Sequence, residues 1–299
     1  SRLLLDKLDF RSSYAVLGDG RRYELESAYF PTIDESMADP YLLTSKEQEI
    51  IDDLKSYFVE STVLQRHVDY LYQRGSLYTR YNGNLLFHGC VLLAEDGSLR
   101  TVNYAGRSYR GRQWFDFCDR MAREAWLHGG REALDFMYFL WCGRISPVSG
   151  REFKTFERAL IPDESTWKEP SDPYYTYINE AETCAMVLQE FGLDPRRGHI
   201  INGHVPVKVR KGESPVKAGG KAIIIDGGFC KAYHKKTGIS GYTLISNSRG
   251  LRLLEHQKIA DVREALKENQ DIESVSETVE LQTCRTTVGD TDEGHIIQD

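Results

Sequence analysis

The sequence lacks a long hydrophobic run. No apolar stretch approaches the roughly 20 residues of a membrane-spanning helix, and the first residues, SRLLLDKLDF, carry charge inside their short apolar run. We therefore expect neither a membrane span nor a secretory signal. Cysteine is scarce as well, with six residues scattered over 299 positions and no C-x-x-C pair. This pattern argues against a zinc ribbon or a disulfide framework, and it indicates a reduced, cytoplasmic protein.

An excess of positive charge is also missing. The chain has 38 Lys and Arg against 45 Asp and Glu, a formal net charge of −7. This balance weighs against a general nucleic-acid-binding protein. The length is sufficient for one large domain or for two of ordinary size.

Hydrophobic periodicity predicts a mixed α/β fold. We expect a hairpin in residues 1–26 that turns at Gly18-Asp19-Gly20, and a short hairpin in 94–110. The spacing predicts a helix with Ser45 as its N-cap, and another that stops near Gly75. Further helices are expected at 112–127, 131–141 and 179–191, with strands before His88 and at 199–201, 221–225, 241–246 and 251–256. Residues 143–175 are expected as loop, and Trp114, Phe115, Cys118, Met121 and Trp126 as packing residues.

Two histidines follow short apolar strands and adjoin a glycine. His88 comes after LLF and precedes Gly89, whereas His204 follows IIN and Gly203. A histidine in such a place is often an ordinary hydrogen-bonded residue. However, glycine allows a bound ion or phosphate to approach the backbone, and strand ends are rigid places to mount a ligand. Because imidazole is the commonest metal ligand, we predict that the rings of His88 and His204 converge on one metal site.

The sequence does not supply a full set of metal ligands. Divalent ions take about four to six ligands, often including carboxylates. The chain contains no aspartate-x-histidine pair, no G-D-x-x-D-R-G and no G-N-H-D/E; the stretch from Gly289 to Asp292 lacks a preceding strand. The other histidines are interpreted as surface or packing residues, with His199 and His234 as candidates for a supporting role. These are His67, His128, His199, His234, His256 and His295.

A basic run lies beside the second histidine. Between Arg196 and Lys221, seven Lys and Arg stand against one acidic residue, Glu213. One reading is a solvated hairpin edge, where lysine discourages further strand pairing. The other is attraction of a polyanionic substrate. The candidate substrate contacts are Lys208, Lys231 and Asn202, and the backbone is expected to approach the ligand at Gly89, Gly203, Gly227 and Gly228.

Several stretches resemble a known enzyme family. YNGNLLFHGC, FLWCGRISP, FGLDPRRGHIINGHVPVKVRKGESPVKAGGKAIIIDGG and KTGISGYTLISNSRGL are similar to the class III fructose-1,6-bisphosphatases of bacteria. Those enzymes are similar to calcineurin-like metallophosphoesterases. The resemblance covers the downstream half of the family, whose upstream half carries the aspartate-x-histidine, G-D-x-x-D-R and N-H-D motifs. The chain departs from the family pattern at Arg144, Cys230 and His234.

The resemblance implies a fold, an activity and a cofactor. It implies a partial metallophosphoesterase core with helical insertions, and hydrolysis of fructose 1,6-bisphosphate to fructose 6-phosphate in gluconeogenesis. The cofactor would be Mn²⁺ or another divalent ion such as Mg²⁺, in a two-ion site to which His88 and His204 contribute. Carboxylates and a general-acid histidine would come from the upstream half, so we expect the chain alone to be inactive and to bind metal weakly. The expected partner is a sugar bisphosphate, with no nucleic acid and no membrane, and a homo-oligomer is left open.

The same resemblance divides the chain into five segments. They are a hairpin plus helical insertion at 1–80, a core strand with the His-Gly-Cys loop at 81–93, a helical insertion or cap at 94–178, a returning core sheet at 179–256 and an acidic tail at 257–299. In the tail we expect one helix, one strand and a loose end. Two other functions stay open: a non-catalytic regulatory or protein-binding module, and a polyanion or RNA binder that uses the run 196–221.

Overall fold

The computed structural model describes most of the chain and divides it into two compact units. The described residues are 5–9, 12–27, 30, 32–33, 39–228, 241–257, 262–271 and 273–298. One unit combines Ser1–Gly75 with Glu152–Pro170, and the other combines Ser76–Arg151 with Ser171–Asp299. The division into five segments stays a prediction, whereas the mixed α/β class is confirmed by the sheets and helices below.

A small antiparallel sheet begins the first unit. After a 3₁₀ turn at Leu5–Lys7, strands β1 (Leu8–Asp9), β2 (Tyr14–Val16) and β3 (Arg22–Glu24) pair in that order. The turn at residues 18–20 joins β2 to β3, as the sequence predicts. Ala15 and Leu25 pack against Ile161 from the second segment, and the Glu26 N–H donates to the Leu160 carbonyl at 2.8 Å. The two segments of this unit therefore share one core.

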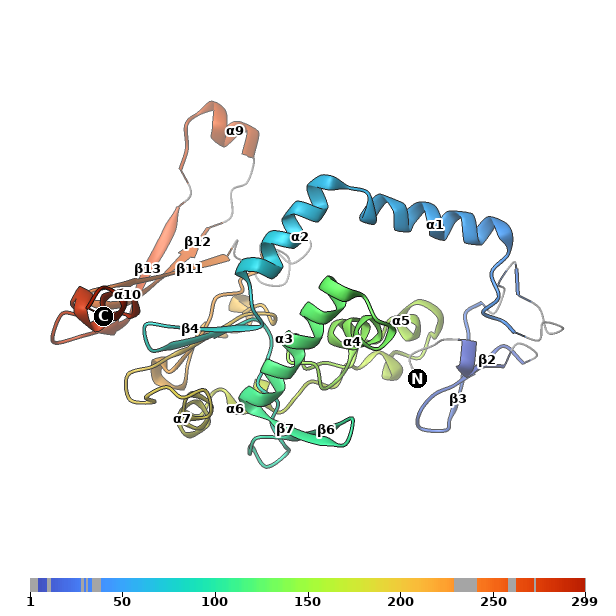
Figure 1. The fold of residues 1–299 in the computed structure, drawn as a ribbon, viewed down its shortest axis with the longest axis horizontal. Helices are drawn as coiled ribbons and strands as arrows, with labels where there is room; N and C mark the ends of the chain where they lie inside the picture. The colour runs from blue at the N-terminus through green and yellow to red at the C-terminus, as the bar shows by residue number, and fades with distance from the viewer. Residues whose placement is uncertain are drawn as a thin grey trace. The chain divides into compact units, whose positions relative to one another are not determined.

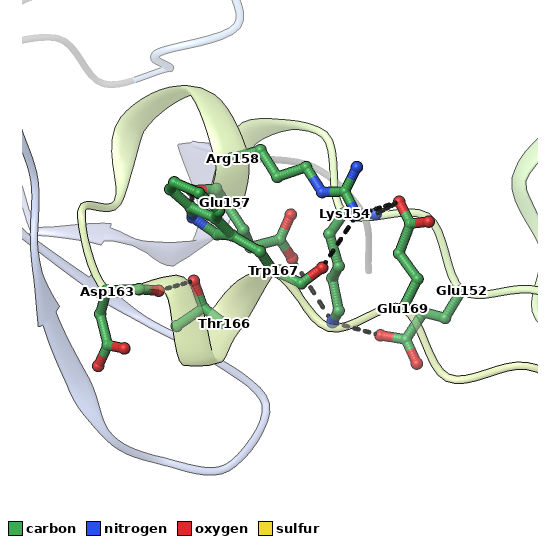
Figure 2. A network of polar contacts seen from close by, with 8 residues as sticks. All are labelled: Glu152, Lys154, Glu157, Arg158, Asp163, Thr166, Trp167 and Glu169. Carbon is green, nitrogen blue, oxygen red and sulfur yellow. Dashed lines mark hydrogen bonds and ion pairs between the residues drawn. The ribbon is translucent and has the colours of Figure 1, made fainter. Parts of the chain in front are cut away.

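A polar network holds the second segment of this unit (Figure 2). It surrounds helix α5 (Phe156–Leu160) and a 3₁₀ turn at Glu164–Trp167, in a stretch that we expected as loop. The Lys154 ammonium lies 2.6 Å from the Glu152 carboxylate and 3.7 Å from that of Glu157, which is buried. The Trp167 indole N–H donates to the carbonyls of Glu157 and Ile161. These bonds tie the turn to the helix.

Two amphipathic helices complete the first unit. The N-cap of helix α1 (Ser45–Val59) is Thr44, not the predicted Ser45, because the Thr44 hydroxyl accepts the Glu47 N–H and the Glu47 carboxylate accepts the Thr44 N–H. Helix α2 (Thr62–Arg74) ends before Gly75, as predicted. No residue of either helix is buried.

A five-stranded sheet is the centre of the second unit (Figure 1). Its order is β4 (Tyr78–Tyr81), β5 (Asn84–Phe87), β8 (Ile200–Asn202), β10 (Ala222–Ile224) and β9 (Val216–Lys217). The inner strands β5, β8 and β10 are parallel, and the two outer strands are antiparallel to them. Leu85, Ile200 and Ile223 are fully buried along these inner strands. The carboxyl ends of the three parallel strands consequently meet at one edge of the sheet.

Helices and a hairpin pack around an aromatic cluster in this unit. They are β6 (Thr101–Tyr104), β7 (Arg107–Arg110), α3 (Gly111–His128), α4 (Arg131–Cys142), α6 (Tyr174–Tyr177) and α7 (Ala181–Glu190). Trp114 stacks on Phe117, with ring centroids 5.6 Å apart, and Phe115 and Cys118 are buried. The predicted packing role of this stretch is confirmed for those residues, whereas Met121 and Trp126 are half-buried.

An antiparallel meander follows, as predicted. Strands β11 (Gly241–Asn247), β12 (Gly250–His256) and β13 (Ser274–Leu281) pair in order, and Tyr242, Leu251 and Leu253 pack against Ile223 of the central sheet. Helix α9 (Val262–Lys267) lies between β12 and β13. The expected loose end instead contains helix α10 (Asp292–Gln298), which Asn82 anchors through two hydrogen bonds with Asp292. Short 3₁₀ turns occur at Val209–Lys211, Ala218–Gly220 and Val288–Asp290.

Within the described ranges, no helix is both long enough and apolar enough to cross a membrane. The cysteines in these ranges are all free thiols, buried at Cys90, Cys118, Cys142 and Cys184 and exposed at Cys284.

Candidate metal centre

The carboxyl ends of the inner strands bring His88 and His204 together. His88 directly follows β5, and His204 follows β8 after Gly203. The Gly203 N–H donates to the His88 carbonyl at 3.0 Å and so continues the pairing of the two strands past their ends. The His88 Nε2 lies 3.1 Å from the His204 Nδ1, with the ring planes at 80°. The predicted convergence of the two rings is confirmed; their role as metal ligands stays a prediction.

The surroundings keep the His204 ring neutral. Burial lowers the pKa of His204 to about 4, and the charges of His88 and Arg151 act in the same direction, against an opposite effect of Asp226. A neutral imidazole offers one ring nitrogen as a lone-pair donor. At neutral pH no proton has to leave His204 before a metal ion binds.

Asp226 is the third strand-end group at this edge, and sequence reasoning missed it. It follows β10 within two residues, and one of its carboxylate oxygens accepts the Gly228 N–H at 2.9 Å. A Cβ added to Gly203 would lie 3.6 Å from the Asp226 Cβ and 3.7 Å from the His88 Nδ1. The sequence contained a signal for Asp226, since it follows the apolar stretch KAIII just as His88 and His204 follow apolar strands.

The predicted glycines serve the site in different ways. A Cβ at Gly89 would lie 2.3 Å from the carbonyl oxygens of both Pro147 and Val148, so the close approach there is made by another loop of the protein. Gly228 has a φ of 71° and bonds Asp226, while Gly227 is buried beside it.

The predicted substrate contacts are only partly gathered here. Asn202 is buried; its Nδ2 donates to the Gly89 carbonyl at 3.3 Å, and its Oδ1 has no hydrogen-bond partner among the described residues. Lys208 is exposed, its N–H bonds the Glu213 carboxylate, and within the described residues no contact joins it to either ring. Lys231, like Cys230 and His234, lies outside the described residues.

Two residues of the basic run form hydrogen bonds and an ion pair within the protein. The Lys221 ammonium donates to the carbonyls of Arg196 and Gly198, and the Arg196 guanidinium pairs with Asp194 at 3.1 Å. These bonds shape the approach to β8 and engage two of the seven cations in the run.

His199 lies at the other end of β8. Its Nδ1 is 3.0 Å from the Asn84 Oδ1, and its Nε2 is 3.6 Å from the Glu280 carboxylate, on the wall of a separate cavity of about 330 Å³. His199, a candidate for supporting the metal site, therefore instead makes contacts that join β5, β8 and β13.

The paired rings fit a divalent ion as part of a larger ligand set. In this structure the two ring nitrogens share a hydrogen bond of 3.1 Å, and two nitrogens on neighbouring positions of one ion, each at about 2.1 Å, would lie at a similar separation of roughly 3 Å. The Asn202 Oδ1 without a partner is an oxygen donor of the kind that hard ions accept. Among the described residues, however, no group of three or more His, Cys, Asp or Glu is placed to hold an ion.

Fold and site together define a mixed α/β protein with a candidate metal-binding sheet edge. The whole chain, residues 1–299, matches the model of the family described as Firmicute fructose-1,6-bisphosphatase. The chain belongs to this family.

Curated relatives carry the name fructose-1,6-bisphosphatase class 3. The protein of Clostridium tetani is 47% identical over 98% of this chain, that of Clostridium acetobutylicum 45% over 98%, and that of Clostridium botulinum strain Langeland 44% over 99%. The chain spans only 44–45% of the length of these relatives. No solved structure matches it significantly.

Proposed function

We propose that this chain is the downstream part of a metal-dependent fructose-1,6-bisphosphatase of the metallophosphoesterase type. Such an enzyme would release phosphate from fructose 1,6-bisphosphate in the cytoplasm during gluconeogenesis. The observation that carries the proposal is the pair of ring nitrogens 3.1 Å apart at the end of adjacent parallel strands. Relatives named for this activity, which match 98–99% of the chain, support it.

Residues of this chain would hold a metal ion and orient the substrate. His88 and His204 would hold one Mn²⁺ or Mg²⁺ ion from a rigid sheet edge, and Asn202 would offer its amide oxygen to the ion or to the substrate. A bound pair of ions would activate water and stabilise the charge that develops on the phosphoryl oxygens. The remaining ligands and the general acid would come from the part of the relatives that lies beyond this chain.

Histidine replacement in the full-length protein that contains this segment tests the proposal. We expect His204→Ala to lower Mn²⁺-dependent release of phosphate from fructose 1,6-bisphosphate by at least about a hundredfold, because a direct ligand outweighs the supporting groups whose loss costs 10–100-fold. His128→Ala, at the exposed end of α3, is the matched control. Turnover near the normal rate in His204→Ala would refute the ligand assignment.

A non-catalytic binding module is the alternative, because the described residues supply a pair of ligands and not a complete set. Calorimetry separates the two: in the full-length protein we expect two bound ions, with binding reduced in either histidine variant. If metal binding is the same in the wild type and in both variants, the alternative is favoured. The hypothesis of a polyanion or RNA binder is less favoured, because Lys221 and Arg196 are engaged in contacts within the protein. Salt-sensitive retention of RNA on a filter would support that hypothesis.

A further inference from the structure

A loop from the helical part of the second unit is locked onto the turn that carries His88. The Cys90 N–H donates to the Pro147 carbonyl at 2.9 Å, and Gly89 leaves no room for a Cβ beneath the same loop. Gly150 has a φ of 56°, and a Cβ there would lie 2.2 Å from the Cys90 Sγ. The loop therefore has little freedom to shift, and the residue that follows it, Arg151, is placed as firmly as the strand end.

The backbone of Arg151 is fixed from its other side as well. It forms an isolated antiparallel bridge with Ser171, and the Asp172 N–H donates to the Gly150 carbonyl at 2.8 Å. The buried Asp172 carboxylate in turn accepts the N–H groups of Leu93 and Tyr174, both at 3.0 Å. These contacts hold the backbone of Arg151 in place near the turn that carries His88.

The Arg151 side chain has a donor that the protein does not use. Its Nε is buried and has no hydrogen-bond partner among the described residues. The loop that precedes Arg151 packs against Gly89, the residue after His88, and the Arg151 charge lowers the pKa of His204. Leaving a charged donor buried and unpaired costs free energy, so such a group is expected to have a partner that arrives from solution.

We propose that Arg151 binds the phosphoryl group of the substrate beside His88 and His204. Guanidinium matches a phosphate dianion with parallel N–H donors, and Nε–H is one of the donors that such a fork uses. This inference rests on the proposed function, and it adds a third cation to the predicted substrate contacts Lys208 and Lys231. Arg151 acts by binding substrate and not by holding metal.

Inorganic phosphate is a probe that needs no metal and no turnover. In the metal-free full-length protein, at pH 7.5 and constant ionic strength, phosphate titrated to millimolar concentrations should shift the NMR signals of the Arg151 Nε–H and the His204 Hε1 with one dissociation constant. Arg151→Gln should weaken this binding by roughly tenfold or more, the equivalent of one charge-assisted hydrogen bond, and Arg151→Lys by less. Arg107→Gln, at the exposed start of β7, should bind like the wild type.

The outcomes separate this inference from the proposed function. Unchanged phosphate affinity in a folded Arg151→Gln protein overturns the inference, as does the absence of any phosphate-dependent shift in the wild type. If Arg151→Gln does not fold, the same comparison between Arg151→Lys and the wild type decides, with equal affinity overturning the inference. Arg151-dependent phosphate binding without Mn²⁺-dependent hydrolysis in the full-length protein would support the subsite and refute the phosphatase. In an active enzyme, we expect Arg151→Gln to raise KM while bound Mn²⁺ is unchanged.

Discussion

His204 has a backbone conformation that few histidines adopt. Its φ is 66°, in the left-handed region, where a residue with a Cβ is strained by an amount on the order of 1 kcal/mol. The conformation turns the chain sharply after Gly203 and brings the His204 ring to His88. Strain of this kind at a strand end, beside an unusually low pKa, is typical of a functional residue.

The low pKa of His204 predicts how stability depends on pH. Between its unfolded pKa near 6.5 and its folded pKa of about 4, the unfolded chain binds a proton that the folded chain does not. The contribution of His204 is therefore complete above about pH 6.5 and is lost as the pH falls towards 4. The full shift corresponds to roughly 3 kcal/mol, and because the ring is only half-buried we expect about 1–2 kcal/mol.

Urea unfolding of the chelator-treated chain measures this effect. The loss of unfolding free energy between pH 6.5 and pH 4 should be smaller in His204→Gln than in the wild type, since glutamine does not titrate. His128→Gln is the control and should follow the wild type. Identical pH dependence in His204→Gln and wild type would contradict a buried neutral ring.

Some single residues could be predicted from the sequence, and others could not. His88 and His204 could, because an apolar strand, a glycine and an imidazole are all local features. The cap at Thr44 was also readable, as Thr44-Ser45-Lys46-Glu47 is a capping-box pattern that we assigned one residue too late. Arg151 could not, because its place depends on a loop that meets Gly89 only in the folded chain.

At the scale of elements, a part-buried lysine lies beside a buried carboxylate in the second segment of the first unit. Glu157 is 3% exposed, and Lys154 is its cation. Breaking such a pair leaves a charge without compensation, which costs about 3–5 kcal/mol, although replacing both partners by apolar groups is often tolerated. The role of Lys154 is therefore to permit the burial of Glu157 beside Ile161 and the β1–β3 sheet.

Replacing Lys154 by methionine tests this role. We expect Lys154→Met to lower the unfolding free energy of the first unit by about 3 kcal/mol, and Lys154→Met with Glu157→Leu to recover much of it. The measurement is guanidinium unfolding followed by Trp167 fluorescence in proteins whose other tryptophans are replaced. Lys168→Met, an exposed change nearby, should cost little. If the single and double variants are equally unstable, the charge of Glu157 is not the cause.

Element types were more predictable than their termini. The parallel strands, the meander and helices α3, α4 and α7 follow from periodicity and from glycine, with ends off by one or two residues. Helix α5 was missed, because its five residues lie between prolines and are held by the Lys154 network and not by a repeated apolar pattern. Helix α10 was missed for a similar reason, since its anchor is Asn82 of the distant β4–β5 turn.

At the scale of the whole molecule, two hydrophobic clusters of the described residues form without the candidate metal ligands. The first unit is packed around Ala15, Leu25 and Ile161, and the meander around Tyr242, Leu251 and Leu253 with Ile223. Neither cluster contains His88 or His204. The fold of this chain should therefore be independent of metal, in contrast to small zinc domains whose folding free energy is metal-binding free energy.

Metal removal tests that independence. We expect the unfolding midpoint of the 299-residue chain to be the same in EDTA as in metal-free buffer, and Mn²⁺ to add no more than about 1 kcal/mol, because a pair of imidazoles binds weakly and the gain follows ligand occupancy. That small gain should vanish in His88→Ala and in His204→Ala and persist in His67→Ala, on an exposed face of α2. In the full-length protein, Mn²⁺ should add several times more, because a complete ligand set raises affinity. Cooperative unfolding of the 299-residue chain by EDTA would show instead that it holds a complete, structure-forming metal site of its own.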